Sequence, residues 1–235
     1  MPGPLALVGG DELKPGNEPQ DELLVRAAGE VSAYVLATAA ARQRPELAVR
    51  NAKRWFARLG LTVEELPARK RSEVRSDLIA TQAAAGRFFY LVGGDPGLVV
   101  DMLRDTPVWE AIVSSWEKGA ALAGSSAGAM ALGEWTLVRG RFPGDSYRRY
   151  KDALGLVPGI AVLPHFERFG HTWIDSARAS ALEAVLVGID ERSAAVWVDG
   201  SWRAFGPGGV TVIAGGATRR FEPGERIEGI LGPAC

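Results

Sequence analysis

The chain has 235 residues, 47% of them hydrophobic and 23% charged, which is ordinary for a globular protein with its own core. Its 27 basic and 28 acidic side chains give a net charge of -1, so charge favours neither nucleic acid nor a membrane surface as a partner. No apolar run approaches the ~18 residues of a membrane span, and no secretory signal is visible. The single cysteine, Cys235, makes no internal disulfide. We therefore expect one cytoplasmic domain over residues 1–235.

Short apolar runs alternate with amphipathic segments through the first 132 residues. The pattern predicts strands over 5–8, 33–41, 61–66, 88–92 and 120–124. It predicts helices over 22–29, 45–59, 72–86, 97–104, 108–119 and 127–132. This order indicates an α/β fold with three layers, in which a mostly parallel sheet carries helices on both faces. Sites in such folds lie beyond the carboxyl ends of strands, where glycine-rich turns stand at 9–10, 93–94 and 124–126.

The last third of the chain has a different pattern. Apolar runs at 160–163 and 185–189 continue the strand series. Short strands are predicted over 194–198, 202–205 and 210–214, separated by glycine-containing turns. We expect these three strands to form antiparallel hairpins near the C-terminus.

Ser126 is the candidate nucleophile. It is the central residue of a Gly-x-Ser-x-Gly run that follows an apolar strand and precedes an apolar helix, which is the context of a nucleophile elbow. An ordinary glycine turn, with Ser125 or Ser126 as a helix N-cap, is the structural alternative. If Ser126 is the nucleophile, the amide of Ala127 is one oxyanion donor, and the turn at 93–94 is a candidate source of the second.

A serine nucleophile needs a base, and the chain has only two histidines. His165 follows the apolar run at 160–163 and is the candidate base, whereas His171 is a candidate substrate contact. A carboxylate usually orients such a histidine. Position alone leaves five candidates open: Glu134, Asp145, Asp152, Asp190 and Glu191.

Four segments resemble the dipeptidase E and cyanophycinase family of serine peptidases. They are residues 92–95, 123–129, 154–166 and 188–191. The resemblance implies a fold like that of class I glutamine amidotransferases, with no metal or organic cofactor. It implies that Ser126 attacks, that His165 acts as base and then acid, and that Glu191 orients His165, with Asp145 in reserve. It also places Gly94 and Asp95 near the oxyanion hole.

The same resemblance implies a short peptide as the partner and allows a homodimer. Dipeptidase E prefers an N-terminal aspartate, which requires cations in the pocket, and Arg168, Arg178 and Arg149 are the candidates. Pro96 stands where cyanophycinases tend to place glutamine, so dipeptides or short peptides are the first expectation. The alternatives are a cyanophycinase-like isopeptidase, another small amide or ester hydrolase, and a non-catalytic binding protein on the same scaffold.

Overall fold

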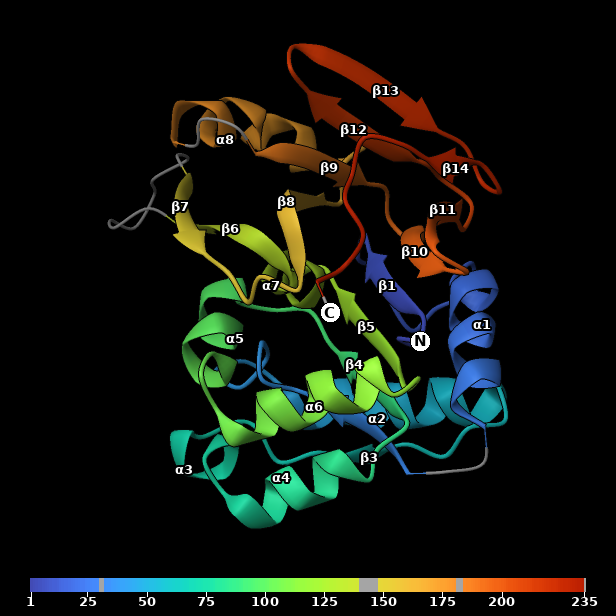
Figure 1. Cartoon of the computed structure of the whole chain (residues 1–235), viewed down its shortest axis with the longest axis vertical. Helices are drawn as coiled ribbons and strands as arrows, with labels where there is room; N and C mark the ends of the chain where they lie inside the picture. Colours follow the sequence, from blue (N-terminus) through green and yellow to red (C-terminus); the bar gives the residue numbers. More distant parts are fainter. Residues whose placement is uncertain (30–31, 140–147, 181–183, 235) are drawn as a thin grey trace.

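The computed structural model describes residues 1–29, 32–139, 148–180 and 184–234, which form two β-sheets and the helices that cover them (Figure 1). The larger sheet has eight strands in the order β14-β11-β10-β1-β5-β4-β2-β3. Its parallel half consists of β1 (Leu5–Val8), β5 (Ala121–Ser125), β4 (Phe88–Leu91), β2 (Ala33–Leu36) and β3 (Glu64–Glu65). The antiparallel half consists of β10 (Ala194–Val198), β11 (Ser201–Phe205) and β14 (Arg226–Ile227).

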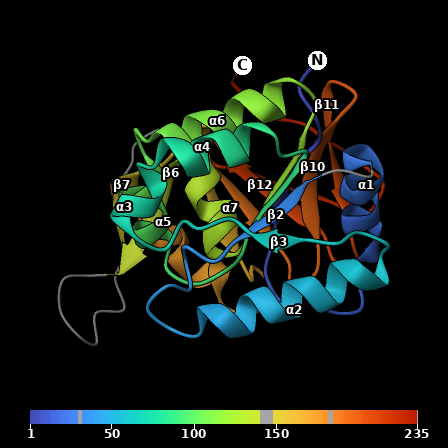
Figure 2. The same cartoon turned by 90° about the horizontal axis from the view of Figure 1, so that it is seen from below.

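Helices cover both faces of this sheet, which confirms the predicted α/β architecture. In Figure 2, α4 (Asp77–Ala84) and α6 (Pro107–Glu117) lie on one face, and α2 (Pro45–Arg58) lies on the other with α1 (Glu18–Ala28). The remaining helical segments are α3 (Arg71–Val74), α5 (Pro96–Leu103), α7 (Ala127–Leu132), the 3-10 turn η1 (Gly170–Trp173) and α8 (Ile174–Ser180). None of the helices formed by the described residues combines the length and the apolar character that a membrane crossing requires.

Each face of the larger sheet packs against its own helical layer, because side chains alternate between the two faces along each strand. In β1, Leu5 and Leu7 pack into the core shared with α6, whereas Ala6 and Val8 pack into the core shared with α1 and α2. Successive strand residues point to opposite faces, so a strand covered on both sides is apolar throughout. This explains why the central strands are continuous apolar runs.

A second sheet of six strands, in the order β13-β12-β9-β8-β6-β7, lies beyond the carboxyl ends of β1 and β5 (Figure 1). Its strands are β6 (Gly133–Arg139), β7 (Arg148–Asp152), β8 (Val157–Pro164), β9 (Val185–Ile189), β12 (Val210–Ala214) and β13 (Ala217–Phe221). The strands β6, β8 and β9 are parallel. The second sheet therefore faces the edge of the first sheet at which its parallel strands end.

The prediction of C-terminal hairpins is correct for one pair of strands and wrong for the third strand. β10 and β11 form the expected antiparallel pair, but β12 pairs with β9 and β13 in the other sheet. The connection at 206–209 crosses between the sheets because its amides are bound elsewhere: Gly208 donates to Ser193 Oγ at 2.8 Å and Gly209 donates to Asp190 Oδ2 at 2.9 Å. The predicted strand at 33–41 also ends early, at Leu36.

Candidate active site

Ser126 lies at the apex of a sharp turn between β5 and α7. Its backbone has φ 48° and ψ -111°, a conformation that costs a non-glycine residue of order 1–3 kcal/mol. The turn is tight enough that a Cβ on Gly124 would collide with the backbone of Gly128. The predicted elbow is therefore present, and it presents the serine side chain beyond the end of the sheet.

The turn that follows β1 connects the three segments that make up the site. Val8 O accepts the Ser126 N–H at 2.9 Å, and Gly9 O accepts the His165 N–H at 2.7 Å. Gly10 O accepts the Arg192 N–H at 2.8 Å. Gly10 has φ 105°, and a Cβ on it would overlap the imidazole of His165. A backbone turn of three residues thus sets the separations among the serine, histidine and carboxylate segments.

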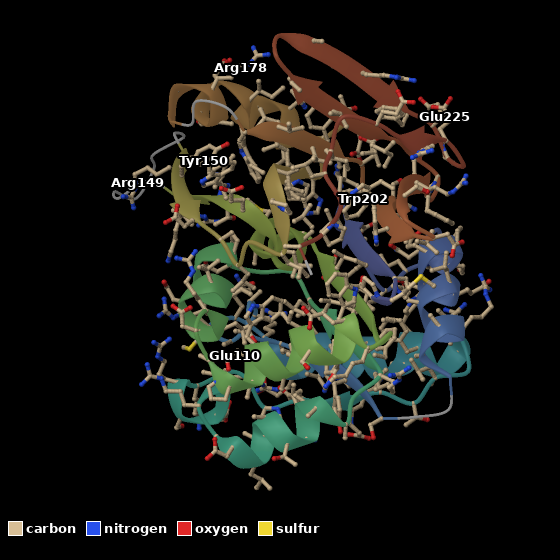
Figure 3. The ribbon with its side chains drawn as sticks, in the orientation of Figure 1. Glu110, Arg149, Tyr150, Arg178, Trp202 and Glu225 are labelled. Atoms are coloured by element: carbon tan, nitrogen blue, oxygen red, sulfur yellow. The ribbon has the colours of Figure 1, made fainter. Side chains whose placement is uncertain are left out.

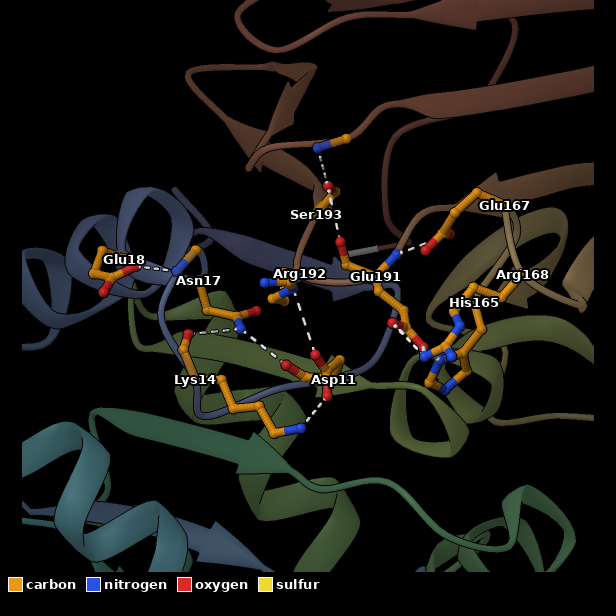
Figure 4. A network of polar contacts seen from close by, with 12 residues as sticks. Asp11, Lys14, Asn17, Glu18, His165, Glu167, Arg168, Glu191, Arg192 and Ser193 are labelled. Atoms are coloured by element: carbon orange, nitrogen blue, oxygen red, sulfur yellow. Dashed lines mark hydrogen bonds and ion pairs between the residues drawn. The ribbon is translucent and has the colours of Figure 1, made fainter.

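Three side chains form a hydrogen-bonded series at this point, and Figure 4 shows its His165 and Glu191 members. His165 Nε2 lies 3.1 Å from Ser126 Oγ, and His165 Nδ1 lies 2.8 Å from Glu191 Oε1. When Nδ1 carries the proton, Nε2 is the acceptor that faces the serine hydroxyl. The side chains of His165 and Glu191 are only 19% and 10% exposed, so water weakly screens their contact. This arrangement can remove a proton from a serine hydroxyl.

The three other candidate carboxylates that the structure describes lie elsewhere. Glu134 Oε2 accepts the Gly159 N–H at 2.6 Å, and Asp190 binds Gly209 and Arg220. Asp152 lies on β7, paired with Trp135. Asp145 lies outside the described residues. Glu191 is therefore the carboxylate that the described structure brings to the histidine.

Two backbone amides next to Ser126 are available to a ligand. Within the described ranges, the N–H groups of Gly94 and Ala127 donate to no protein acceptor. Ala127 is the first residue of α7, where an N–H has no intrahelical partner. Both residues line the same pocket as Ser126. They are suitably placed to donate to an oxygen held above the serine.

That pocket has a volume of about 570 Å³ and a wall rich in cations. Its basic residues are Arg42, Arg139, Arg148, Arg149 and Lys151, and its acidic residues are Asp95 and Asp101. Lys151 forms an ion pair with Asp101, which cancels one charge of each sign. The remaining lining side chains therefore favour an anionic ligand.

Among the arginines that line the pocket, Arg148 is half-buried and Arg42, Arg139 and Arg149 are exposed. The Arg148 guanidinium lies 4.0 Å from the ring centroid of Trp173, which also lines the pocket. Burial lowers the pKa of Arg148, and the charge of Arg139 lowers it further, while Asp95 raises it. Arginine stays charged despite such shifts, so the site holds a poorly solvated cation that a carboxylate ligand would stabilise.

Comparison with known protein families assigns the chain to a family of peptidases. The family model for peptidase family S51 matches residues 5–204. The chain belongs to this family. Members of the family are serine peptidases, which agrees with the serine at the turn between β5 and α7. Membership of the family supports a hydrolase.

Two cyanophycinases are similar to this chain in sequence over most of its length. The cyanophycinase of Trichormus variabilis is 32% identical over 195 residues, covering 79% of this chain and 65% of the relative. This chain therefore spans about two thirds of that relative's length. The cyanophycinase of Synechococcus elongatus is 26% identical over 218 residues, covering 90% of this chain and 68% of the relative.

A peptidase from an acI-B1 actinobacterium superposes with a TM-score of 0.85 at 29% identity, covering 97% of each chain. A putative peptidase E from Listeria monocytogenes shares the fold, with a TM-score of 0.60 and 17% identity over 97% of this chain and all of the other.

The sequence predicted that Arg168, His171 and Arg178 contact the substrate, but none of the three lines the pocket. Arg168 pairs instead with Glu191, with Nη1 at 3.1 Å from Oε2 and 3.2 Å from Oε1. His171 is exposed, and its Nδ1 lies 2.8 Å from Phe166 O. Arg178 is exposed on α8 (Figure 3). The Arg168, Phe169 and Gly170 amides all donate back to His165 O, which forms a tight turn. This turn leaves Phe169 and Trp173, rather than the three predicted residues, in the wall of the pocket.

Asp95 and Arg149 do line the pocket, as predicted. Asp95 also caps α5, accepting the Leu98 N–H at 3.2 Å. Sequence reasoning missed Arg42, Arg139 and Arg148, which reach the pocket from a turn and from the second sheet. It also missed Glu12, although Glu12 directly follows the glycine turn at the end of β1. Within the described ranges, no group of three or more metal-ligating side chains occurs.

Proposed function

We propose that this chain is a serine peptidase that hydrolyses short peptides through an acyl-enzyme on Ser126. The observation that carries the proposal is the hydrogen-bonded series from Ser126 through His165 to Glu191, at 3.1 and 2.8 Å. A serine is a weak nucleophile unless a base takes its proton, and the base is effective only in the correct tautomer. This series supplies both requirements.

The proposed reaction has two halves. His165 Nε2 takes the hydroxyl proton while Ser126 Oγ attacks the carbonyl carbon, and the N–H groups of Gly94 and Ala127 stabilise the oxyanion. His165 then gives its proton to the leaving amine as the C–N bond breaks. In the second half, water loses a proton to His165 and attacks the ester carbon, and the proton returns to Ser126. Glu191 holds the Nδ1 proton and stabilises the charged imidazole throughout.

The pocket favours short substrates with acidic groups. A volume of about 570 Å³ falls within the range of pockets that enclose small ligands. The cations that remain after the Lys151–Asp101 pair are suited to a carboxylate, and Arg148 is the most shielded of them. We therefore place dipeptides and short peptides with an acidic residue first among the substrates.

A cyanophycinase-like isopeptidase is the second candidate. The curated relatives that match over most of this chain carry the name cyanophycinase. The chemistry of the acyl transfer would be unchanged, and only the pocket contacts would differ. Hydrolysis of β-aspartyl-arginine in preference to all α-linked dipeptides supports this second candidate over the first.

The deciding experiment compares Ser126→Ala with Ser125→Ala on a dipeptide library that includes β-aspartyl-arginine. Ser126→Ala is expected to lose about 10⁴-fold or more in kcat/KM, since serine and histidine act as a unit. Ser125 is the matched control. Its buried hydroxyl lies beside that of Tyr90, which takes no part in the proposed reaction, so its removal should change kcat/KM by less than about threefold.

Full activity in Ser126→Ala contradicts the proposal. Labelling with a serine-directed phosphonate separates the enzyme from a non-catalytic binding protein on the same fold. Stoichiometric modification of Ser126 that disappears in His165→Ala supports the enzyme. Absence of both labelling and turnover across the library supports the binding protein.

A further inference from the structure

Glu12 lies beside the nucleophile and has no part in the reaction described above. Its Oε1 accepts the Gly93 N–H at 2.9 Å. The point at which a Cβ of Gly93 would stand is 3.1 Å from Glu12 Oε1 and 3.7 Å from Ser126 Oγ. The carboxylate and the serine hydroxyl therefore border the same small space above the Gly93 backbone.

A second hollow, of about 430 Å³, opens next to the first pocket. Glu12, Leu13, Val92 and Gly93 line it, and Gln43 lines both hollows. Gly93 faces the second hollow and Gly94 the first, so the two hollows meet at this turn, next to Ser126. A substrate bound at Ser126 can reach into both.

The first pocket has an excess of cations, whereas the second hollow has one charge of each sign. Glu12 is the acidic residue of the second hollow, and its one basic residue, Arg44, is exposed and forms no ion pair with Glu12. Across the described ranges, Glu12 takes part in no salt bridge. The Gly93 N–H occupies one position on Oε1 and leaves Oε2 free to accept. The half-buried carboxylate is thus held in place and electrostatically unsatisfied.

We propose that Glu12 binds the α-ammonium group of the substrate's first residue and makes the enzyme an exopeptidase that acts at a free N-terminus. This inference rests on the proposed function. The α-nitrogen is attached to the carbon next to the carbonyl, so it lies close to Ser126 Oγ whenever the carbonyl is under attack. A carboxylate beside Ser126 can then make a charge-assisted hydrogen bond of ~2.7–2.9 Å to it. The acidic groups of the substrate lie in the cation-rich pocket on the other side.

The experiment compares a dipeptide substrate with its des-amino analogue, in which hydrogen replaces the amino group. The analogue is smaller, so bulk cannot explain its rejection. Wild-type protein is expected to favour the dipeptide about 100-fold or more in kcat/KM. Glu12→Gln should reduce that ratio at least about tenfold, through a higher KM for the dipeptide. Its amide oxygen can still accept the Gly93 N–H, so the change removes charge and keeps the turn.

Two further variants keep the test interpretable. Glu12→Asp keeps the charge at shorter reach and should retain part of the preference. Glu22→Gln, an exposed change on α1, should leave the ratio at its wild-type value. Because the ratio is taken within one protein, a partial loss of folded enzyme cancels from it.

Equal kcat/KM for the dipeptide and its analogue in wild-type protein would overturn the inference. An equal loss on both substrates in Glu12→Gln would also overturn it, because Glu12 would then act only by shaping the Gly93–Gly94 turn. Both results leave Ser126-dependent hydrolysis intact. Absence of Ser126-dependent hydrolysis of any substrate is a different result, and it removes the proposed function together with this inference.

Discussion

Glu191 is held from two sides, by His165 and by Arg168. Oε1 contacts both His165 Nδ1 and Arg168 Nη1, and Oε2 contacts Arg168 Nη1. The Arg168 side chain is 66% exposed and that of Glu191 only 10%. The guanidinium therefore positions the carboxylate from the solvent side, which gives Arg168 a role other than the substrate contact predicted from the sequence.

Glu191→Gln should reduce kcat by up to about 10⁴-fold with little change in KM. The neutral amide no longer stabilises the charged imidazole, and its NH2 group can turn toward Nδ1 and impose the wrong tautomer. Steady-state kinetics on the best library substrate would measure this. Glu167→Gln is the matched control. Glu167 is exposed and, among the described residues, accepts only the Glu191 N–H, which glutamine can also accept, so this change should cost far less activity. Equal losses in the two variants would count against the assigned role of Glu191.

At the scale of elements, the turn after β1 decides the geometry of the site. Three consecutive carbonyls, from Val8 to Gly10, accept the amides of Ser126, His165 and Arg192. These residues follow β5, β8 and β9, which belong to two different sheets. The turn therefore joins the sheets where their functional strand ends meet. A small displacement of this turn would move all three segments.

Gly10→Ala tests this role. The new Cβ would overlap the imidazole of His165 at φ 105°, so we expect about a 100-fold loss of kcat/KM and about 1–3 kcal/mol of stability. Gly60→Ala is the control, because Gly60 has φ 85° with no atom within 4 Å of its Cβ position. It should lose stability without losing activity. Urea denaturation and kinetics measure the two effects, and normal activity in Gly10→Ala would refute the assigned role.

At the scale of the whole molecule, a buried carboxyl joins the two helices α1 and α2, which cover the same face of the sheet. Asp21 of α1 is fully buried and accepts the Trp55 Nε1–H of α2 at 2.7 Å. Burial raises the pKa of Asp21 from 3.8 to about 8; the hydrogen bond from Trp55 lowers it, and the charges of Glu12 and Glu18 raise it. The folded protein therefore holds this carboxyl in its neutral form well above the pH at which it ionises in the unfolded chain.

The consequence is a pH-dependent stability with a defined sign. Between pH 3.8 and about 8 the unfolded state has lost the Asp21 proton and the folded state has kept it. The unfolded state binds fewer protons, so this group lowers the free energy of unfolding as pH rises, by up to about 1.4 kcal/mol per pH unit. Above the pKa of Asp21 in the folded protein, this group no longer changes the free energy of unfolding with pH.

Asp21→Asn should remove this loss, because asparagine is neutral at every pH and its oxygen can still accept from Trp55. The variant's stability advantage over wild-type protein should grow with pH between 3.8 and about 8. Urea denaturation across that window measures it. Glu22→Gln, its exposed neighbour, should show no comparable trend. Parallel curves for Asp21→Asn and wild-type protein would contradict the raised pKa.

Much of the site was predictable because it depends on local backbone chemistry. A strand, a glycine, a serine and an apolar helix specify the elbow at Ser126, and His165 stands at the end of another apolar run. Glu191 required the family resemblance, since five carboxylates were equally placed by position alone. The pairing of Arg168 with Glu191 could not be predicted. It depends on a turn in which several amides donate to His165 O, and no residue pattern in the sequence indicates that turn.

Local pattern alone determined the α/β class, the parallel central strands and the nucleophile turn, because alternating burial and glycine punctuation leave a direct trace in sequence. Tertiary structure decided the second sheet, the partner of β12, the cations around the pocket and the position of Glu12. Strand partners and pocket walls come from segments far apart in the chain. Their contacts arise only when the two sheets pack together, so no single stretch of residues encodes them.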